Sequence, residues 1–300
     1  MVSFSKNNKS ERGYKKPNPG PAYSWPMGGW FSAFFIIPIV IIIMYSFCAK
    51  DIFGGIKWEF SLDAYKSIFA QIDGKFLYIP LLWRTLWTAT IATFACIVIA
   101  IPCGYAMARS KRQTLFLILI IIPFLTNSLI RIFAWKTILG EQGFINSILA
   151  LFSVSPKKLI GSNWTIILVN IYMFLPYAIL PVFTAVDRFD FTLLEAARDL
   201  GATKPGSMFR ILLPGIRSGI ISSLIFTFIP IFGNYTVPLL VGSKETRMLG
   251  QTIYEASTTS RNLPLASAFS VILTLVSMAA ILLMIASENK EAKLNKMKKD

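Results

Sequence analysis

The residues with the clearest capacity for specific chemistry form one polar stretch between two long apolar segments, Glu195-Ala-Ala-Arg-Asp-Leu-Gly201. After nine further residues comes Ile211-Leu-Leu-Pro214. The alanines and leucines favour a short helix, and Gly201 suits the left-handed position that ends one. A polar, charged helix of this kind between two apolar segments is expected to lie on the surface of the molecule.

The residues around this stretch predict how it is held. Thr192 and Glu195 have the spacing of a capping box, in which each side chain binds the other's free backbone N–H. Thr203 is placed to cap a second short helix that has Pro205 in its first turn. Pro214 then predicts a break before the next apolar segment. Together these signals predict a helix–turn–helix.

Most catalytic and metal chemistry is disfavoured by residue types. The chain has no His, and its three cysteines, Cys48, Cys96 and Cys103, lie singly in apolar segments, so a metal site is not expected. Neither a Gly-x-Ser-x-Gly nucleophile motif nor a Gly-x4-Gly-Lys-Ser/Thr phosphate loop occurs. We therefore expect no enzyme activity, no cofactor and no ATP hydrolysis by this chain alone.

Composition places the chain in a membrane. Hydrophobic residues make up 54% of it and the mean hydropathy is +0.59, which is too apolar for a soluble domain of this length. The net charge of +15 could suggest nucleic acid. However, the basic residues lie in the tails and at the ends of apolar segments, as membrane topology requires, and no nucleic-acid partner is expected.

The uncharged segments predict an all-α integral membrane protein with six transmembrane helices, the fourth broken by prolines and the fifth interrupted at Pro230, Gly233 and Pro238. A basic, Pro-rich tail without regular structure precedes them, a Lys-rich tail follows them, and the external loop 50–84 carries a short helix near 61–69. The predicted segments are the tail 1–27, the spans 28–49, 85–108, 113–130, 159–186, 218–243 and 262–287 within the domain 28–287, the polar loop 187–217, and the tail 288–300.

The distribution of positive charge predicts the orientation. Eighteen of the thirty Lys and Arg residues fall in the two tails, the 109–112 turn and the 187–217 loop, and twelve fall in the three opposite loops. Short segments with excess positive charge stay in the cytoplasm. Both termini and the 187–217 loop are therefore expected inside.

The complete pattern Glu-Ala-Ala-x3-Gly-x9-Ile-x-Leu-Pro resembles the cytoplasmic signature loop of permease subunits of bacterial ATP-binding-cassette importers. The resemblance implies the type I importer permease fold in the bacterial plasma (inner) membrane, with an ATPase dimer, a second homologous permease and an extracytoplasmic solute-binding protein as partners. It also implies that Glu195 pairs with an Arg of the ATPase. The residues implied in ATPase coupling are Glu195, Ala196, Ala197, Asp199, Gly201, Ile211, Leu213 and Pro214.

A second resemblance concerns the solute. Pro123-Phe-Leu-Thr-Asn-Ser-Leu-Ile-Arg-Ile-Phe133 and the segment from Leu194 to Lys204 resemble the B-type permease of spermidine/putrescine importers, over roughly residues 30 to 285. A polyamine is therefore the expected solute. An amino acid, an anion or ferric iron in the same type of importer remains an alternative. A secondary transporter is less favoured, because the spans show no internal repeat and no ionisable relay, and a membrane-embedded enzyme is disfavoured by the absence of His and of acids in the spans.

The spans contain no Asp or Glu, so a polycation would have to be held by aromatic faces, amides and freed backbone carbonyls. Such intramembrane polar groups either line a route or pair across helices. Arg131, at the end of the third span, would repel a cation and is expected to be an interfacial anchor. The predicted pathway residues are Asn127, Tyr172, Tyr177, Asn234 and Tyr235.

Overall fold

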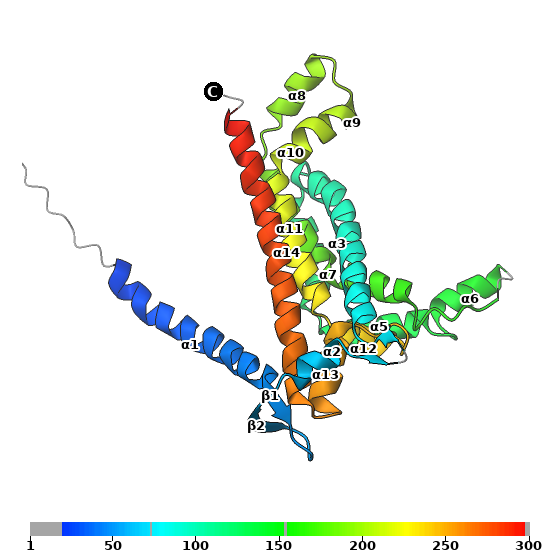
Figure 1. Cartoon of the computed structure of the whole chain (residues 1–300). Helices are drawn as coiled ribbons and strands as arrows, with labels where there is room; N and C mark the ends of the chain where they lie inside the picture. Colours follow the sequence, from blue (N-terminus) through cyan, green and yellow to red (C-terminus); the bar gives the residue numbers. More distant parts are fainter. Residues whose placement is uncertain (1–19, 73, 153–154, 298–300) are drawn as a thin grey trace, which may run out of the picture.

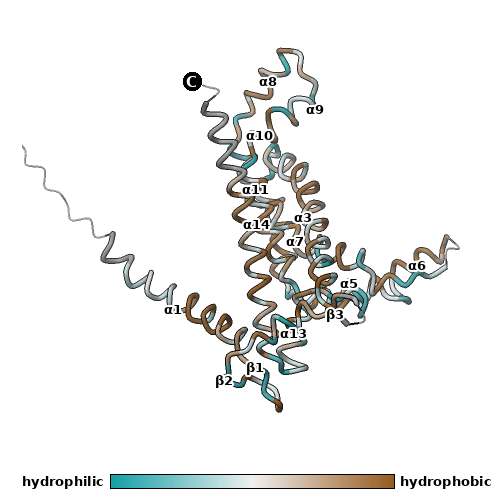
Figure 2. Tube along the Cα trace, in the orientation of Figure 1, coloured by the Kyte–Doolittle hydropathy of each residue, from teal (hydrophilic) through white to brown (hydrophobic). Residues whose placement is uncertain are grey.

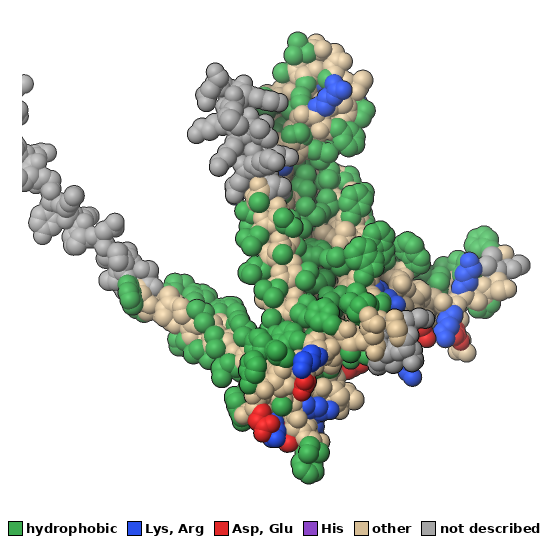
Figure 3. Space-filling view, viewed as in Figure 1, with side chains coloured by type: hydrophobic (Ala, Val, Ile, Leu, Met, Phe, Trp, Pro, Cys, Tyr) green, Lys and Arg blue, Asp and Glu red, His purple; other side chains and the backbone are tan. Residues whose placement is uncertain are grey.

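The computed structural model describes residues 20–72, 74–152 and 155–297, and within them the chain is mostly helical. Three long helices, α3 (Ile79–Ala108), α7 (Asn163–Asp187) and α11 (Arg217–Phe232), pack side by side, and α14 (Leu263–Met297) runs along them (Figure 1). Hydrophobic residues fill the middle of these helices (Figure 2), and Lys and Arg side chains lie towards the two ends (Figure 3). This distribution is the one expected of a helical bundle that crosses a bilayer.

Small residues allow the central helices to approach closely. A Cβ on Gly104 of α3 would lie 3.0 Å from Val182 Cγ1 of α7, and a Cβ on Gly219 of α11 would lie 2.9 Å from the Pro181 carbonyl and overlap Ala185. In a membrane, lipid chains are as apolar as the side chains, so the hydrophobic effect does not drive helices together. Close backbone approach of this kind instead favours association through van der Waals packing. The bundle is therefore held at defined crossings between α3 and α7 and between α7 and α11.

Length and composition identify the helices able to cross a membrane. Within the described residues, four qualify alone, and up to six qualify if each of two bent pairs counts as one. The four are Trp25–Ser46 within α1 (Gly20–Ser46), α3, α7 and Leu263–Ala286 within α14. The bent pairs are α4 (Gln113–Leu125) with the stretch Ser128–Leu151, and Lys204–Gly215 with α11.

The predicted third span, 113–130, is wrong as one continuous helix. Helix α4 ends at Leu125, and α5 (Ser128–Leu139) starts a stretch turned by 88°. Thr126 is extended, and the side chain of Asn127 accepts a hydrogen bond from the Leu129 N–H at 2.8 Å. An Asn cap of this kind starts a new helix, so the chain turns there.

Prolines had opposite effects in the next two predicted spans. The expectation that Pro176 and Pro181 break the fourth is wrong, since α7 is continuous through both. The interruption of the fifth is confirmed, because α11 ends at Phe232 and α12 (Thr236–Val241) starts after a three-residue gap. Neighbouring helices satisfy the groups that a proline frees in a membrane helix, so proline alone does not fix a break.

Helix α1 differs from the expectation of an irregular 1–27 tail. It begins at Gly20, with Pro21 in its first turn, where a missing N–H costs little, and it continues through Pro26. Residues 1–19 of the expected tail lie outside the described residues. At the other end, α14 continues past the predicted span limit at 287 to Met297, so much of the expected tail is helical.

The segment between α1 and α3 holds more structure than the predicted short helix. That helix is confirmed as α2 (Asp63–Ile68). Two small antiparallel pairs were not predicted and depart from a purely helical fold: β1 (Cys48–Lys50) with β2 (Ile56–Phe60), and β3 (Gln71–Ile72) with β4 (Lys75–Phe76). At the same end lie α6 (Phe144–Leu151) and α13 (Leu249–Thr258), far from α8 (Thr192–Asp199) and α9 (Lys204–Ser207) (Figure 1).

Candidate functional site

The loop that carries the signature pattern begins with a cap different from the predicted one. Asp190 accepts hydrogen bonds from the Thr192 hydroxyl at 2.7 Å and from the Thr192 N–H at 3.0 Å. Thr192 is already inside α8, and no side chain caps this helix at its N-cap residue Phe191. The predicted Thr192–Glu195 capping box is therefore wrong. It requires Thr192 to be the N-cap residue, but α8 starts one residue earlier, with Phe191 as the N-cap. Hydrogen bonding to Thr192 lowers the pKa of Asp190, so its carboxylate stays charged.

The turn between the two short helices matches its prediction. Gly201 has φ +87°, and its N–H binds the Arg198 carbonyl at 2.9 Å. Thr203 caps α9 by accepting from the Gly206 N–H at 3.2 Å, with Pro205 in the first turn. A Cβ on Gly201 would meet nothing within 4 Å, so glycine is favoured here by backbone conformation and not by lack of space.

The second half of the pattern contains a π-helix, Met208–Leu212, followed by α10 (Leu213–Gly215). Pro214 cannot donate to the preceding turn, and its ring needs room there, which a wider π turn supplies. Leu212, at the variable position of the pattern, is fully buried, while Ile211 and Leu213 are half-buried and Pro214 is exposed. Leu212, at a position where the pattern allows any residue, is therefore the residue that anchors this half of the loop.

Leucine and isoleucine anchors seat the loop on the bundle. Leu194 and Ile216 are 2% and 1% exposed, and with Leu212 they pack in one apolar cluster with Met107 of α3 and Val186 of α7. Since α8 and the π-helix are tied to α3 and α7 through these residues, a force on the loop reaches the bundle.

The outer face of the loop combines small, acidic and large apolar residues. Glu195, Ala196 and Asp199 are exposed, and Ala197 is half-buried. Leu200 and Phe209 are 90% and 70% exposed, although neither was predicted as a functional residue. A leucine directly before the helix-ending glycine was the available signal for Leu200. Exposed apolar side chains beside small residues suit a protein partner that covers them.

Two of the five predicted pathway residues meet in a cavity. Tyr177 of α7 and Asn234, between α11 and α12, line a cavity of about 270 Å³ with Arg131 of α5. The other three lie elsewhere. Asn127 caps α5, Tyr172 packs against Trp135 with ring centroids 5.3 Å apart, and Tyr235 stacks on Tyr254 at 4.9 Å. The remaining cavity residues are Phe124, Ser128, Ile132, Met173, Phe174 and Thr236.

Asn234 also stabilises the break between α11 and α12 through hydrogen bonds. Its amide Nδ2 donates to Asn170 Oδ1 at 3.0 Å, and its Oδ1 accepts from the backbone N–H of Thr236 at 2.9 Å and of Val237 at 3.3 Å. Asn170 is fully buried in α7 and donates to the Ile166 carbonyl at 2.9 Å. Both ends of the Asn234 side chain are thus used, so pairing across helices describes it better than solute binding.

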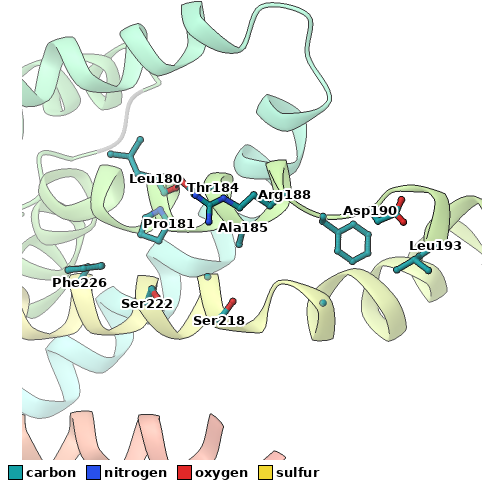
Figure 4. Close-up of a pocket in the computed structure, with 13 residues that line it drawn as sticks. Leu180, Pro181, Thr184, Ala185, Arg188, Asp190, Leu193, Ser218, Ser222 and Phe226 are labelled. Atoms are coloured by element: carbon teal, nitrogen blue, oxygen red, sulfur yellow. Dashed lines mark hydrogen bonds between the residues drawn. The ribbon is translucent and has the colours of Figure 1, made fainter. Parts of the chain in front are cut away.

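A larger groove of about 820 Å³ runs between α7 and α11 towards the loop (Figure 4). Its polar lining includes Thr184, Arg188, Ser218 and Ser222, none of which was predicted. The sequence signal for Ser218 and Ser222 was their spacing of four residues, which places both on one face of a helix. Lipid chains cannot satisfy these groups, so this face suits another protein surface or water.

Comparison with protein families and sequences gives consistent results. Residues 96–289 match the family described as "Binding-protein-dependent transport system inner membrane component". The chain is similar to the spermidine/putrescine transport system permease protein PotB of Haemophilus influenzae, with 33% identity over 87% of this chain and 91% of that protein. It is also similar to PotB of Escherichia coli K12, with 34% identity over 83% and 90% of the two chains.

Solved structures share the fold. A chain of a bacterial ABC transporter involved in the import of the acidic polysaccharide alginate aligns with a TM-score of 0.73 over 90% of this chain and 94% of its own length. A chain of the MetNI methionine ABC transporter aligns with a TM-score of 0.53 over 73% and 95%. Identities of 16% and 20% make these likenesses evidence of architecture alone.

Proposed function

Because the chain belongs to the family of binding-protein-dependent transport system inner membrane components and is a permease subunit of an ATP-binding-cassette importer, we propose that its solute is a polyamine. The observation that carries this proposal is the 33–34% identity to spermidine/putrescine permeases over more than four-fifths of the chain. The alginate and methionine transporters share the fold at much lower identity and support no solute.

The cavity lining offers partial support for a polycation. Tyr177 packs edge-on against Phe124, with centroids 4.9 Å apart, and lies 5.9 Å from the Phe174 ring. Aromatic faces bind ammonium groups, and the electrostatic attraction strengthens where water is excluded. We propose Tyr177 as the first contact of this chain with the solute, with Asn234 holding the cavity wall and Asn127, Tyr172 and Tyr235 supporting the helices around it.

A second candidate solute is one that carries a carboxylate, such as an amino acid, because Arg131 lines the same cavity. A polyamine would be repelled by the charge of Arg131, whereas the carboxylate of an amino acid would be attracted by it. Uptake into vesicles containing the reconstituted complex, driven by internal ATP, separates them. We expect labelled spermidine and putrescine to accumulate, and labelled glutamate and methionine not to accumulate. Accumulation of an amino acid without either polyamine would overturn the polyamine proposal in favour of the second candidate.

We further propose the partners of the complex. The exposed face of the 187–217 loop, with Glu195, Ala196 and Gly201, fits an ATPase dimer, with Glu195 pairing with an arginine of the ATPase. The polar groove between α7 and α11 and helix α4, none of whose residues is buried, fit a second homologous permease. An extracytoplasmic solute-binding protein would dock on the opposite end, around α2 and α13.

For the topology, we propose six spans with both termini and the 187–217 loop in the cytoplasm. Single cysteines in a variant lacking Cys48, Cys96 and Cys103 test it in intact cells. An impermeant thiol reagent is expected to label Ile52→Cys, where the native side chain is 94% exposed, but to label Lys204→Cys only after the membrane is opened. Labelling of Lys204→Cys in intact cells would reverse the orientation.

A further inference from the structure

Arg131 lies in a cavity and not at the end of a continuous helix. Its helix, α5, starts after the 88° turn, and the guanidinium lines the 270 Å³ cavity, with Cζ 5.5 Å from the centroid of Phe124. Its Nε is buried and has no hydrogen-bond partner. The side chain therefore points towards an aromatic ring and a polar wall within the protein.

Among the residues that the structure describes, no carboxylate forms an ion pair with Arg131 or lines its cavity. Arginine stays protonated at any physiological pH. The cavity lining contains no Asp or Glu, and none of the predicted spans contains one. A buried charge is stable only if it is paired or well hydrogen-bonded. Arg131 is half-buried, its buried Nε has no hydrogen-bond partner, and the Phe124 ring supplies only a weak electrostatic contact, so a carboxylate from outside this chain would stabilise the guanidinium once a partner covers the cavity.

The cavity faces a surface that is open in this chain. Tyr177 is 38% exposed, Ser128 is exposed, and the groove between α7 and α11 continues the same face of α7 through Leu180 and Pro181. A polycationic solute repels a guanidinium and cannot neutralise it. If the solute is a polyamine, the carboxylate must come from a partner, and the second permease, which we place against α4 and the groove beside α7, is the partner that would cover this face.

We propose that Arg131 forms an ion pair with a carboxylate of the second permease subunit across the transport route, and that the polyamine displaces Arg131 from this carboxylate as it passes. The inference rests on the proposed polyamine function. It assigns Arg131 a positioning role. The carboxylate of the second permease binds Arg131 when the route is empty and binds the polyamine when the solute passes. The polyamine's affinity is then set by competition with a charge fixed in this chain.

The test is uptake of labelled spermidine by the reconstituted complex carrying Arg131→Gln, Arg131→Lys or, as a control, Lys136→Gln on the exposed part of the same helix. Removing the competing charge is expected to lower the spermidine KM about tenfold, within the ordinary range of coupling between sites, without raising kcat. Arg131→Lys keeps the charge and is expected to keep the KM within about twofold, far from the tenfold change. Lys136→Gln is expected to change neither constant.

A second measurement covers the case in which Arg131→Gln assembles poorly. Each Asp and Glu in the membrane part of the second permease is neutralised in turn in the complex with wild-type Arg131. One neutralisation is expected to raise the spermidine KM, and adding Arg131→Gln to it should have no further effect. An unchanged or raised KM in assembled Arg131→Gln, or no coupled carboxylate in the scan, would overturn the ion pair. Failure of the wild-type complex to transport any polyamine would instead overturn the proposed function.

Discussion

Gly201→Asp is expected to abolish ATP-driven uptake while leaving the protein in the membrane. Gly201 has φ +87°, and a side chain there costs about 1–2 kcal/mol of backbone strain. The position is exposed and its Cβ would meet no atom of this chain within 4 Å, so the bundle itself should tolerate the change. In the complex, a new carboxylate beside Asp199 would be buried against the ATPase without a partner. The expected result is loss of ATPase binding or of its coupling to uptake.

The control is Gly201→Asn, which has nearly the same size, no charge and a better tolerance of the left-handed conformation. It should retain most uptake, and Glu195→Ala should show an intermediate loss. Co-purification of the ATPase, solute-stimulated hydrolysis and uptake are measured together. If Gly201→Asp and Glu195→Ala leave all three unchanged, the 187–217 loop is not the coupling element.

The second large effect is expected from Gly219→Val, and here assembly should fail before coupling does. A Cβ at this position would overlap Ala185 and lie 2.9 Å from the Pro181 carbonyl of α7. Backbone cannot move aside as a flexible side chain can, so α7 and α11 must separate. Overpacking of this kind costs about 1–3 kcal/mol or more. The apparent melting temperature in detergent should fall by roughly 5 °C or more, with loss of uptake.

Gly29→Val is the matched control, because a Cβ on Gly29 of α1 would meet nothing within 4 Å. It should melt within about 1 °C of the wild type, as expected for a site away from the packed core. Equal melting temperatures for the two valine variants would show that the α7–α11 crossing tolerates a larger separation than its geometry indicates.

Local signals in the sequence predicted the parts of this molecule that depend on local backbone chemistry. Gly201 and Thr203 act as expected, since a left-handed turn and a helix cap involve only neighbouring residues. The cap of α8 was misassigned because the Thr192 hydroxyl and N–H both donate to Asp190, which places Thr192 inside the helix and not at its N-cap. The residue at which α8 starts depends on where the preceding helix ends.

Contacts between residues far apart in the sequence determine the helix breaks that local sequence signals did not predict. Pro176 and Pro230 look alike in sequence, yet only the second lies near a break. The break after α11 is fixed by Asn234, which reaches Asn170 sixty-four positions earlier, and by Gly250 of α13, whose Cβ would lie 2.8 Å from the Gly233 carbonyl. Similarly, Arg131 could be placed in a cavity only once α5 was known to turn away from α4. These contacts have no signature within one segment.

The continuous length of α14 has a mechanical consequence. At 35 residues it is about 52 Å long, more than the hydrocarbon core of a bilayer, and it ends at the same end of the molecule as α8 (Figure 1). At its other end, Phe269 is buried in a cluster with Ile68 of α2, Leu81 of α3 and Leu249 of α13. One stiff rod therefore joins the two faces of the molecule. If the loop 187–217 binds the ATPase as proposed, a tilt imposed on α14 at the end where α8 lies is expected to move the opposite end, with α2 and α13, in the opposite direction.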